Sequence, residues 1–306
     1  MMANSKWQMA KQGIQRRDAE GAEGRREGGM TKTILKWPGG KRWLLRELLP
    51  MIPPKGCFVD LFGGAGSVLF AREATGVEVY NDTHEGLVNL FRVVKFHYQA
   101  LVQEFEFSLN SRADFIARRD ATGETDIQRA GSFLFLNALS FGGAGDSFGV
   151  VKKKGGGAAT HLGRVLDRVY ALKDRLADVI IEQKDWRDCL SVYDSPESFF
   201  FADPPYIGGD VPAYRAWTMD ELRGLAEALA GARGKWLLTI NDSKEVRELF
   251  AGCRMRGFAR QRGIANRTAG QREVFRELVV TRGNGMDGRD GKYGRGHMAD
   301  SKGGAR

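Results

Sequence analysis

The stretch SFFFADPPY, from Ser198 to Tyr206, decides the fold. Its first half, residues 198–202, is an apolar aromatic run that is too short for a helix, and two prolines stop it. Neither proline has an N–H to donate, so neither can continue a strand ladder or a helix interior. The sequence therefore predicts a short buried strand. It leaves the Asp203 carboxylate, free backbone carbonyls and the Tyr206 ring at its carboxyl end, where ligands bind in open α/β sheets.

This group of side chains suits a planar amine. A carboxylate beside a carbonyl accepts two hydrogen bonds from one NH2 group, and a phenol ring can stack on the heterocycle that carries it. An exocyclic amine is a poor nucleophile because its lone pair is delocalised into the ring. Two acceptors favour a pyramidal nitrogen and so stabilise the transition state more than the ground state. The alternative is that Asp-Pro-Pro is merely a strand-ending turn, and these residues alone leave both interpretations open.

Length, charge and cysteine content limit the class of protein. The chain has 306 residues, enough for one large domain or two small ones, and its net charge of +9 favours a polyanionic partner. Cys57, Cys189 and Cys253 are far apart, which indicates reduced thiols in a cytoplasmic protein, and the histidine spacing predicts no metal site. No apolar run approaches membrane-spanning length, so we expect no membrane contact.

A nucleotide-binding pattern precedes this strand in the sequence. The apolar run Cys57–Phe62 predicts a strand, and Gly63-Gly64-Ala65-Gly66 leads from it into a helix expected over Ser67–Glu73. A second strand, Val77–Tyr80, ends in Asn81-Asp82, where an acidic side chain can hold ribose hydroxyls. The third glycine of dinucleotide-binding proteins and the Gly-Lys-Ser/Thr of triphosphate sites are missing. S-adenosylmethionine (SAM) fits, since it has a ribose and an amino-acid tail but no phosphate.

Strands and helices alternate along the rest of the chain, which predicts a mostly parallel sheet. Residues 109–175 interrupt the alternation with helical patches and glycine-rich stretches. They contain Lys152-Lys153-Lys154, for which we favour contact with phosphates over a solvated loop tip. The polar segments 1–29 and 284–306 are predicted to be disordered tails, and Met30 is a candidate start codon.

Four motifs follow one another in a fixed order: Leu35-Lys36-Trp37-Pro38-Gly39-Gly40-Lys41, Asp60-Leu61-Phe62-Gly63-Gly64-Ala65-Gly66, Asn81-Asp82 and Asp203-Pro204-Pro205-Tyr206. In this order the chain resembles the Dam-type family of SAM-dependent DNA adenine-N6 methyltransferases, over roughly residues 33–282. The resemblance implies an α/β fold: a Rossmann-like, seven-stranded SAM-methyltransferase sheet with an inserted, mainly helical target-recognition domain. Residues 30–108 and 176–283 would form the discontinuous catalytic domain, and residues 109–175 the insert.

The resemblance also implies roles for individual residues. Asp203 and the Pro204 carbonyl would hold the N6 amine of an adenine flipped out of double-stranded DNA, and Tyr206 would stack on that base. With Pro205, these are the predicted catalytic residues. The cofactor-binding residues would be Trp37, Gly39, Lys41, Asp60, Phe62, Gly63, Gly66, Asp82, Asp185 and Asp203. The predicted DNA contacts are Lys152, Lys153, Lys154, Arg262, Asn266 and Arg267. SAM would be the methyl donor, no metal would be needed, and we expect a monomer or weak dimer.

The insert departs from the family pattern. Members that read GATC carry an Asn-Arg-x-x-Phe-Asn-Gly-type stretch, whereas Leu136–Gly143 keeps the asparagine, the aromatic and one glycine but lacks the arginine. The target sequence is therefore open. Alternative functions are methylation of cytosine N4, of RNA adenine or of protein glutamine, or DNA binding without methyl transfer. Ser or Asn at position 203 would be typical of the alternative enzymes, and a pure binder would have no reason to retain Asp203, Tyr206 and Asp82.

Overall fold

The computed structural model describes residues 33–74, 76–106, 111–121, 123–140, 142–149, 162–208, 214, 217–261 and 274–282. Both predicted tails lie outside these residues, and so do all six predicted DNA contacts. Within the described ranges, none of the helices has the length and apolar character that crossing a membrane requires.

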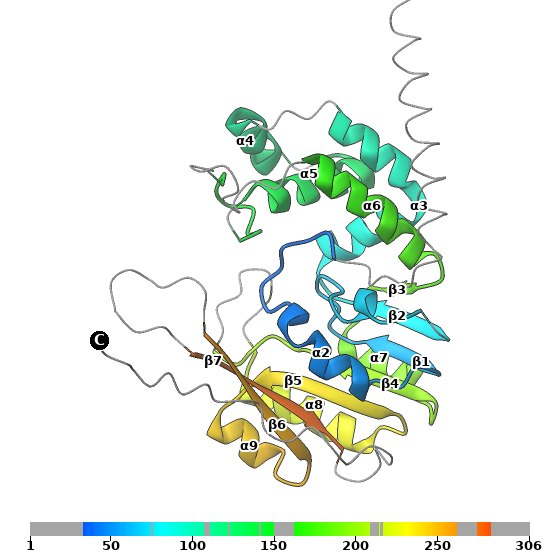
Figure 1. Cartoon of the computed structure of the whole chain (residues 1–306), viewed down its shortest axis with the longest axis vertical. Coiled ribbons are helices and arrows are strands. Elements are labelled where there is room, and N and C mark those ends of the chain that lie inside the picture. The colour runs from blue at the N-terminus through cyan, green and yellow to red at the C-terminus, as the bar shows by residue number, and fades with distance from the viewer. Residues whose placement is uncertain are drawn as a thin grey trace, which may run out of the picture.

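The centre of the fold is a seven-stranded sheet with the order β3-β2-β1-β4-β5-β7-β6 (Figure 1). Strands β1 to β5 pair in parallel, whereas β7 is antiparallel to β5 and to β6. The strand order reverses between β1 and β4, and ligands bind at such a switch point in open α/β sheets. The predicted seven-stranded, Rossmann-like sheet is confirmed. Its strands are β1 (Cys57–Asp60), β2 (Val77–Asn81), β3 (Ile180–Glu182), β4 (Ser198–Ala202), β5 (Lys235–Asn241), β6 (Arg254–Gln261) and β7 (Val274–Thr281).

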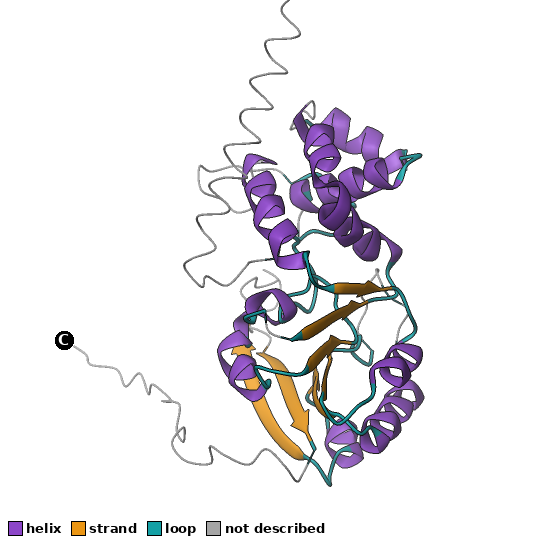
Figure 2. Cartoon of the chain, turned by 90° about the vertical axis from the view of Figure 1, so that its right-hand side faces the viewer, coloured by secondary structure: helices purple, strands orange, loops and turns teal. Residues whose placement is uncertain are grey.

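Helices lie on both sides of the sheet (Figure 2). One face carries the short elements η2 (Lys41–Trp43), α2 (Leu45–Leu48) and η3 (Leu49–Met51), together with η4 (Leu69–Ala71) and α3 (Glu85–Glu106). The other face carries α7 (Trp186–Tyr193), α8 (Met219–Gly231) and α9 (Lys244–Leu249). The sheet is therefore the middle layer of three, and each side of every central strand is buried.

The helix expected over Ser67–Glu73 is wrong, because only the 3-10 turn η4 forms there. Arg72 follows that turn with extended backbone angles, φ −85° and ψ 155°. In this conformation its guanidinium turns inward and donates hydrogen bonds to the Glu78 carboxylate and the Pro53 carbonyl. The Arg72–Glu78 ion pair therefore favours the extended conformation of Arg72 over a second helical turn.

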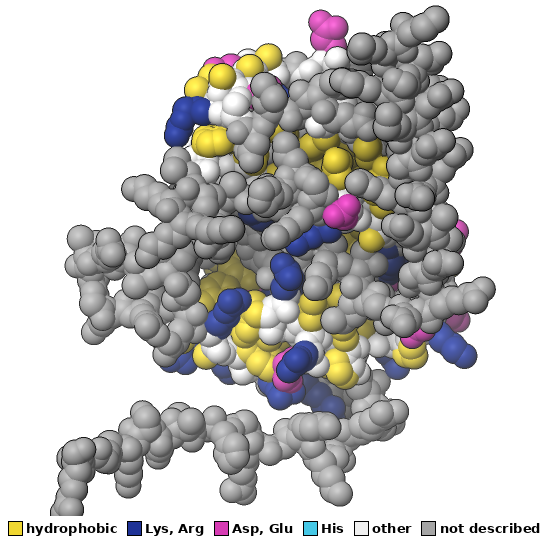
Figure 3. Space-filling model, turned by 45° about the horizontal axis from the view of Figure 1, so that its top comes forward, with side chains coloured by type: hydrophobic (Ala, Val, Ile, Leu, Met, Phe, Trp, Pro, Cys, Tyr) yellow, Lys and Arg dark blue, Asp and Glu magenta, His cyan; other side chains and the backbone are white. Residues whose placement is uncertain are grey.

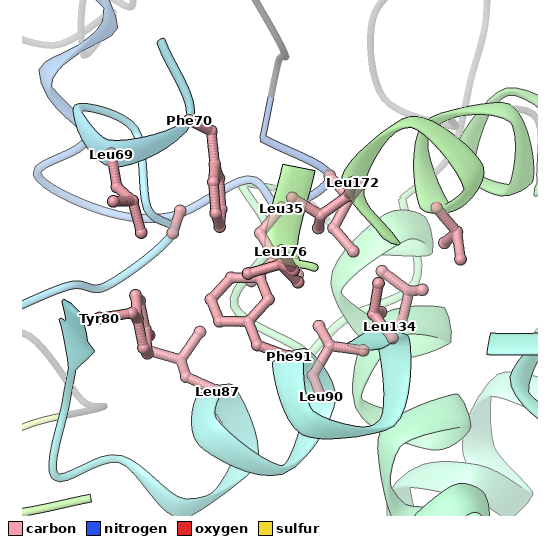
Figure 4. Packing of buried hydrophobic residues seen from close by; sticks show 14 of the residues in the cluster. Leu35, Leu69, Phe70, Tyr80, Leu87, Leu90, Phe91, Leu134, Leu172 and Leu176 are labelled. Atoms are coloured by element: carbon pink, nitrogen blue, oxygen red, sulfur yellow. The ribbon is translucent and has the colours of Figure 1, made fainter. Parts of the chain in front are cut away.

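Side chains alternate across β4, as the period of a strand requires. Phe199 and Phe201 belong to the core under α2 and α3, while Phe200 and Ala202 belong to the core under α7 and α8. Figure 4 shows the first core, in which Tyr80 of β2 and Phe91 of α3 pack edge to face with ring centroids 4.9 Å apart. The same alternation directs Asp203 towards the α2 face.

Three further helices follow α3 in the chain before β3, and together with α3 they lie above the β3 edge of the sheet (Figure 1). They are α4 (Arg112–Asp120), α5 (Asp126–Leu139) and α6 (Leu162–Leu176). Helix α5 begins with a capping box, in which the Thr125 hydroxyl accepts from the Gln128 N–H and the Gln128 side chain accepts from the Thr125 N–H. The boundaries of the inserted target-recognition domain stay a prediction.

Candidate active site

A buried lysine lies at the centre of the candidate site. The turn before it has Gly39 at φ +77°, a backbone conformation that favours glycine, and it leads into η2, which begins at Lys41. The Lys41 side chain is 2% exposed, and its Nζ lies 2.6 Å from Asp203 Oδ1 and 3.3 Å from Glu277 Oε1. Nζ also donates to the Gly39 carbonyl at 2.7 Å and to the Tyr206 hydroxyl at 3.0 Å. The Pro-Gly-Gly-Lys and Asp-Pro-Pro-Tyr motifs, far apart in sequence, thus meet at one ammonium group.

Asp203 follows β4 at the switch point of the sheet. Its Oδ1 accepts from Lys41 and from the Thr239 hydroxyl, which lies 2.9 Å away on the neighbouring strand β5. Burial raises the pKa of the Asp203 carboxyl, and the contacts with Lys41 and Thr239 oppose that effect. Within the described part of the chain, every contact of Asp203 is made by Oδ1, so Oδ2 remains available as an acceptor.

Glu277 is a site residue that the sequence analysis missed. It lies on β7, its side chain is 1% exposed, and its Oε1 accepts a 2.5 Å hydrogen bond from the Tyr206 hydroxyl. Phe275, two residues earlier on the same face of β7, stacks on the Tyr206 ring with centroids 5.9 Å apart and planes 20° apart. A carboxylate inside the apolar run 274–280 was the available signal, because strand period 2 places position 277 beside the buried Val279.

Asp60 ends β1 next to this cluster and is 1% exposed. Its Oδ1 is buried and has no hydrogen-bond partner within the described residues, while the Phe62 backbone N–H donates to the carboxylate. Burial raises the pKa of the Asp60 carboxyl well above its usual range, and the neighbouring Asp203 and Asp82 carboxylates raise it further. A buried acceptor without a partner costs free energy, so this position favours a cationic or hydrogen-bond-donating ligand.

Asp82, which follows β2, holds the glycine-rich turn in place. Its Oδ2 accepts from the Gly64 N–H at 2.7 Å and from the Tyr214 hydroxyl at 3.0 Å, and its Oδ1 accepts from the His84 N–H at 2.8 Å. Burial raises the pKa of the Asp82 carboxyl, and these hydrogen bonds oppose the rise. A carboxylate offers about four lone-pair sites, so one further hydrogen bond can be accepted here.

Gly63 and Gly66 are required by packing within the chain. A Cβ atom at Gly63 would lie 2.2 Å from the Tyr80 ring, and one at Gly66, where φ is +67°, would lie 2.2 Å from the Phe70 ring. Their N–H groups donate to the Asn81 and Gly63 carbonyls respectively, both at 2.7 Å. Contact of these glycines with a cofactor stays a prediction.

Comparison with known proteins assigns the chain to a family. A model of the D12 class N6 adenine-specific DNA methyltransferases matches residues 37–264 of the chain. The chain belongs to this family. It is 26% identical over 234 residues to the type II methyltransferase M.CviBI of Paramecium bursaria Chlorella virus NC1A, covering 72% of this chain and 87% of the relative.

Two cellular relatives cover more of the chain. A DNA adenine methylase of Vibrio cholerae O395 is 25% identical over 272 residues, covering 81% of this chain and 95% of the relative. That of Escherichia coli K12 is 24% identical over 273 residues, covering 81% and 94%. The chain is an adenine-specific DNA methyltransferase, and the reaction is methylation of adenine N6, which decides among the functions weighed from the sequence.

The remaining predicted cofactor residues of this methyltransferase occupy different settings. Trp37 makes edge contacts with His84 and Tyr214, at centroid distances of 5.4 and 6.2 Å, and so lies beside Asp82. Phe62 packs edge to face on Trp217, 5.4 Å away. Asp185 is half-exposed; it caps α7 by accepting from the Arg187 N–H and pairs with the Arg187 guanidinium. Asp185 is therefore engaged in a local cap, and a role towards a cofactor stays a prediction.

The helical region of the methyltransferase is joined to the segment that carries Trp37. Asn137 of α5 accepts from the Lys36 N–H at 3.0 Å and donates to the Lys36 carbonyl at 2.7 Å and the Gly143 carbonyl at 2.9 Å. Lys36 Nζ in turn donates to the Ala138 carbonyl at 2.7 Å. The asparagine that the sequence shares with its family is thus a buried link between α5 and the chain leading to Lys41.

Proposed function

We propose that the methyl donor is SAM, and that the methyl group goes to N6 of an adenine flipped out of duplex DNA at Asp203-Pro204-Pro205-Tyr206. The observation that carries this proposal is the pair of acceptors at the switch point. Asp203 presents Oδ2 with no partner among the described residues, and the buried Asp60 Oδ1 likewise has none. Two open acceptors at adjacent strand ends suit two donors, the target amine and the cofactor.

The residues present suit SAM. Asp60 Oδ1 would accept from the ammonium of the amino-acid tail, a positive charge that would lower the raised pKa of that carboxyl. Asp82 would use its remaining acceptor site for a ribose hydroxyl, and Trp37 beside it would supply an aromatic wall.

When bound, SAM supplies a methyl group on a sulfonium, which is already a strong electrophile. Asp203 Oδ2 and the Pro204 carbonyl would accept the two N6 hydrogens and favour a localised lone pair. On taking up the methyl group, N6 would gain a positive charge and would then have to lose one proton. The Asp203 carboxylate, whose pKa burial raises, is placed to accept that proton. Lys41 and Thr239 fix Oδ1, so Oδ2 keeps its direction.

Basic loops would bring the duplex to the site. Lys152, Lys153, Lys154, Arg262, Asn266 and Arg267 are proposed to contact DNA from outside the described residues. Lys and Arg side chains run down the middle of the face shown in Figure 3, and the chain carries a net charge of +9, both of which suit a polyanion. We propose a cytoplasmic monomer or weak dimer.

Asp203 provides the test. Transfer of tritiated methyl groups from SAM to mixed-sequence duplex DNA would be measured at saturating SAM for wild type, Asp203→Ala and Asp203→Asn. Asp203→Ala should lower the rate about 10²–10³-fold, because a preorganised acceptor is lost. Asp203→Asn should lose less than Asp203→Ala, since its amide oxygen can still accept a hydrogen bond, but its rate should stay below wild type because an amide cannot take up the N6 proton. Asp242→Asn is the matched control: Asp242 follows the neighbouring strand β5 and pairs with Arg247 on the surface.

DNA binding should survive in all these variants, because phosphate contacts elsewhere would provide it. Near-wild-type transfer by Asp203→Ala would show that Asp-Pro-Pro is only a turn. If the Asp242→Asn control lost as much activity as Asp203→Ala, the effect would not be specific to the site.

A further inference from the structure

We propose that Glu277 is a positioning residue for methyl transfer, which acts by anchoring the Tyr206 hydroxyl and the Lys41 ammonium. This inference rests on the proposed function of the Asp203-Pro204-Pro205-Tyr206 segment. No motif of the sequence includes Glu277, which comes 71 residues after Tyr206 along the chain.

Strand β7 holds Tyr206 at two points. The Glu277 carboxylate accepts a 2.5 Å hydrogen bond from the Tyr206 hydroxyl, and Phe275, on the same face of the strand, stacks on the Tyr206 ring. Glu277 pairs with Asn241 of β5 on one side and with Phe258 of β6 on the other, so its backbone lies inside the sheet and not at an edge. A loop side chain is thereby fixed by a rigid element.

The direction of the Tyr206 ring follows from these contacts. One face of the ring lies against Phe275, so a target base can stack only on the other face. Loss of the hydroxyl anchor would leave the ring free to rotate away from that direction. Side chains whose orientation is fixed before the substrate arrives lose less entropy on binding it.

Glu277 also determines what Lys41 contacts. The ammonium has three hydrogens, and four acceptors surround it: Asp203 Oδ1, Glu277 Oε1, the Tyr206 hydroxyl and the Gly39 carbonyl. Glu277 pairs with Lys41 next to Tyr206, while Lys41 also pairs with Asp203. The side chains of Lys41, Asp203 and Tyr206 therefore keep one arrangement. The charged or titratable groups that face Glu277 are Lys41, Asp203 and Tyr206.

The test compares Glu277→Ala with the conservative Glu277→Gln, whose amide oxygen can still accept from Tyr206. Single-turnover methyl transfer at saturating SAM and the KM for DNA would be measured for each, with extrusion of the target base followed by 2-aminopurine fluorescence. Glu277→Ala should slow transfer roughly tenfold, the usual effect of losing one hydrogen bond to a charged group, while Glu277→Gln keeps most of the rate. Glu245→Ala, an exposed glutamate at the start of α9, is the control.

A double-mutant cycle with Tyr206→Phe separates positioning from general damage to the fold. If Glu277 acts through the Tyr206 hydroxyl, Glu277→Ala should cause a smaller loss in the Tyr206→Phe protein than in wild type. If Glu277→Ala does not fold, Tyr206→Phe alone, which removes the same hydrogen bond, should slow transfer by a similar factor, and a wild-type rate in that variant would overturn the inference. Wild-type rate and KM in Glu277→Ala, or strictly additive losses in the cycle, would overturn the inference while leaving the proposed function intact. Near-wild-type activity of Asp203→Ala would overturn the proposed function itself.

Discussion

Two buried ionic clusters lie on the same face of the sheet. They differ in whether every carboxylate oxygen has a hydrogen-bond donor. Near the amino end of β2, Arg72 and Arg175 share the carboxylate of Glu78, and both of its oxygens accept hydrogen bonds. At the carboxyl ends of β1 and β4, beside the amino-terminal half of the antiparallel β7, one ammonium serves Asp203 and Glu277. There Glu277 Oε2 and Asp60 Oδ1 are buried without a partner among the described residues.

The difference separates a structural cluster from a functional one. Arg175 of α6 also donates to the Leu69 carbonyl at 2.6 Å, and Arg72 covers the Phe58 ring, so the first cluster joins helix, turn and sheet. Both oxygens of its carboxylate are occupied, and among the described residues it leaves only a donor, Arg175 Nε, buried without a partner. Unpaired buried acceptors cost free energy, and a fold retains them where a ligand will supply donors. Carboxylate oxygens that are buried without a donor, more than burial itself, therefore distinguish the candidate active site from the Glu78 cluster.

A Glu→Gln substitution in each cluster tests this comparison. The largest change in the free energy of unfolding is expected at Glu78. Glu78→Gln leaves two buried guanidinium groups without their shared carboxylate, which should lower the free energy of unfolding by about 3–5 kcal/mol. Urea denaturation would measure it. A loss below about 1 kcal/mol would mean that the cluster is not a structural one.

Glu277→Gln should gain stability relative to wild type as the pH rises, the opposite of the loss expected for Glu78→Gln. Burial raises the pKa of the Glu277 carboxyl from 4.5 to about 7, so between these pH values the folded protein keeps a proton that the unfolded chain has lost. Wild-type stability therefore falls as pH rises through that window. Glu277→Gln lacks this titration, so its stability relative to wild type should rise by on the order of 2 kcal/mol from pH 4.5 to 7.

Urea denaturation of both proteins at pH 5 and pH 8 would measure this change. Parallel loss of stability in the two proteins over that range would contradict the raised pKa of the Glu277 carboxyl. Glu78→Gln, measured at the same two pH values, is the matched control from the Glu78 cluster.

The smallest effect is expected for Thr239→Val. This substitution removes a hydroxyl from the functional cluster while the side chain keeps nearly the same shape. The hydrogen bond to Asp203 Oδ1 contributes about 1 kcal/mol, so methyl transfer at saturating SAM should fall roughly fivefold with little change in unfolding. Thr281→Val, another buried threonine at the end of β7, is the control and should leave the rate unchanged. Equal rates in all three proteins would remove Thr239 from the site.

Much of the fold was predictable from local patterns. The run before Asp203 and the run before the glycine-rich turn are both buried strands, and they are neighbours in the sheet. Period and turn chemistry determine such elements, because they depend on residues only a few positions apart. The helix predicted over Ser67–Glu73 is only a 3-10 turn at Leu69–Ala71, where Arg72 leaves helical geometry and pairs with Glu78 on the next strand, a pairing that the helical pattern does not contain.

The sequence by itself determined which motifs carry carboxylates, glycines and aromatic rings, and it placed Asp203 at a strand end and Asp60 within the strand before the glycine-rich turn. Only the tertiary structure decided that Lys41 bridges Asp203 and Glu277, that β7 anchors Tyr206, and that Asn137 holds the backbone of Lys36. The physical reason is that these contacts join residues far apart in the chain. They form only when the strand order and the antiparallel pairing of β7 with β5 bring these residues together, and no local sequence pattern predicts that pairing.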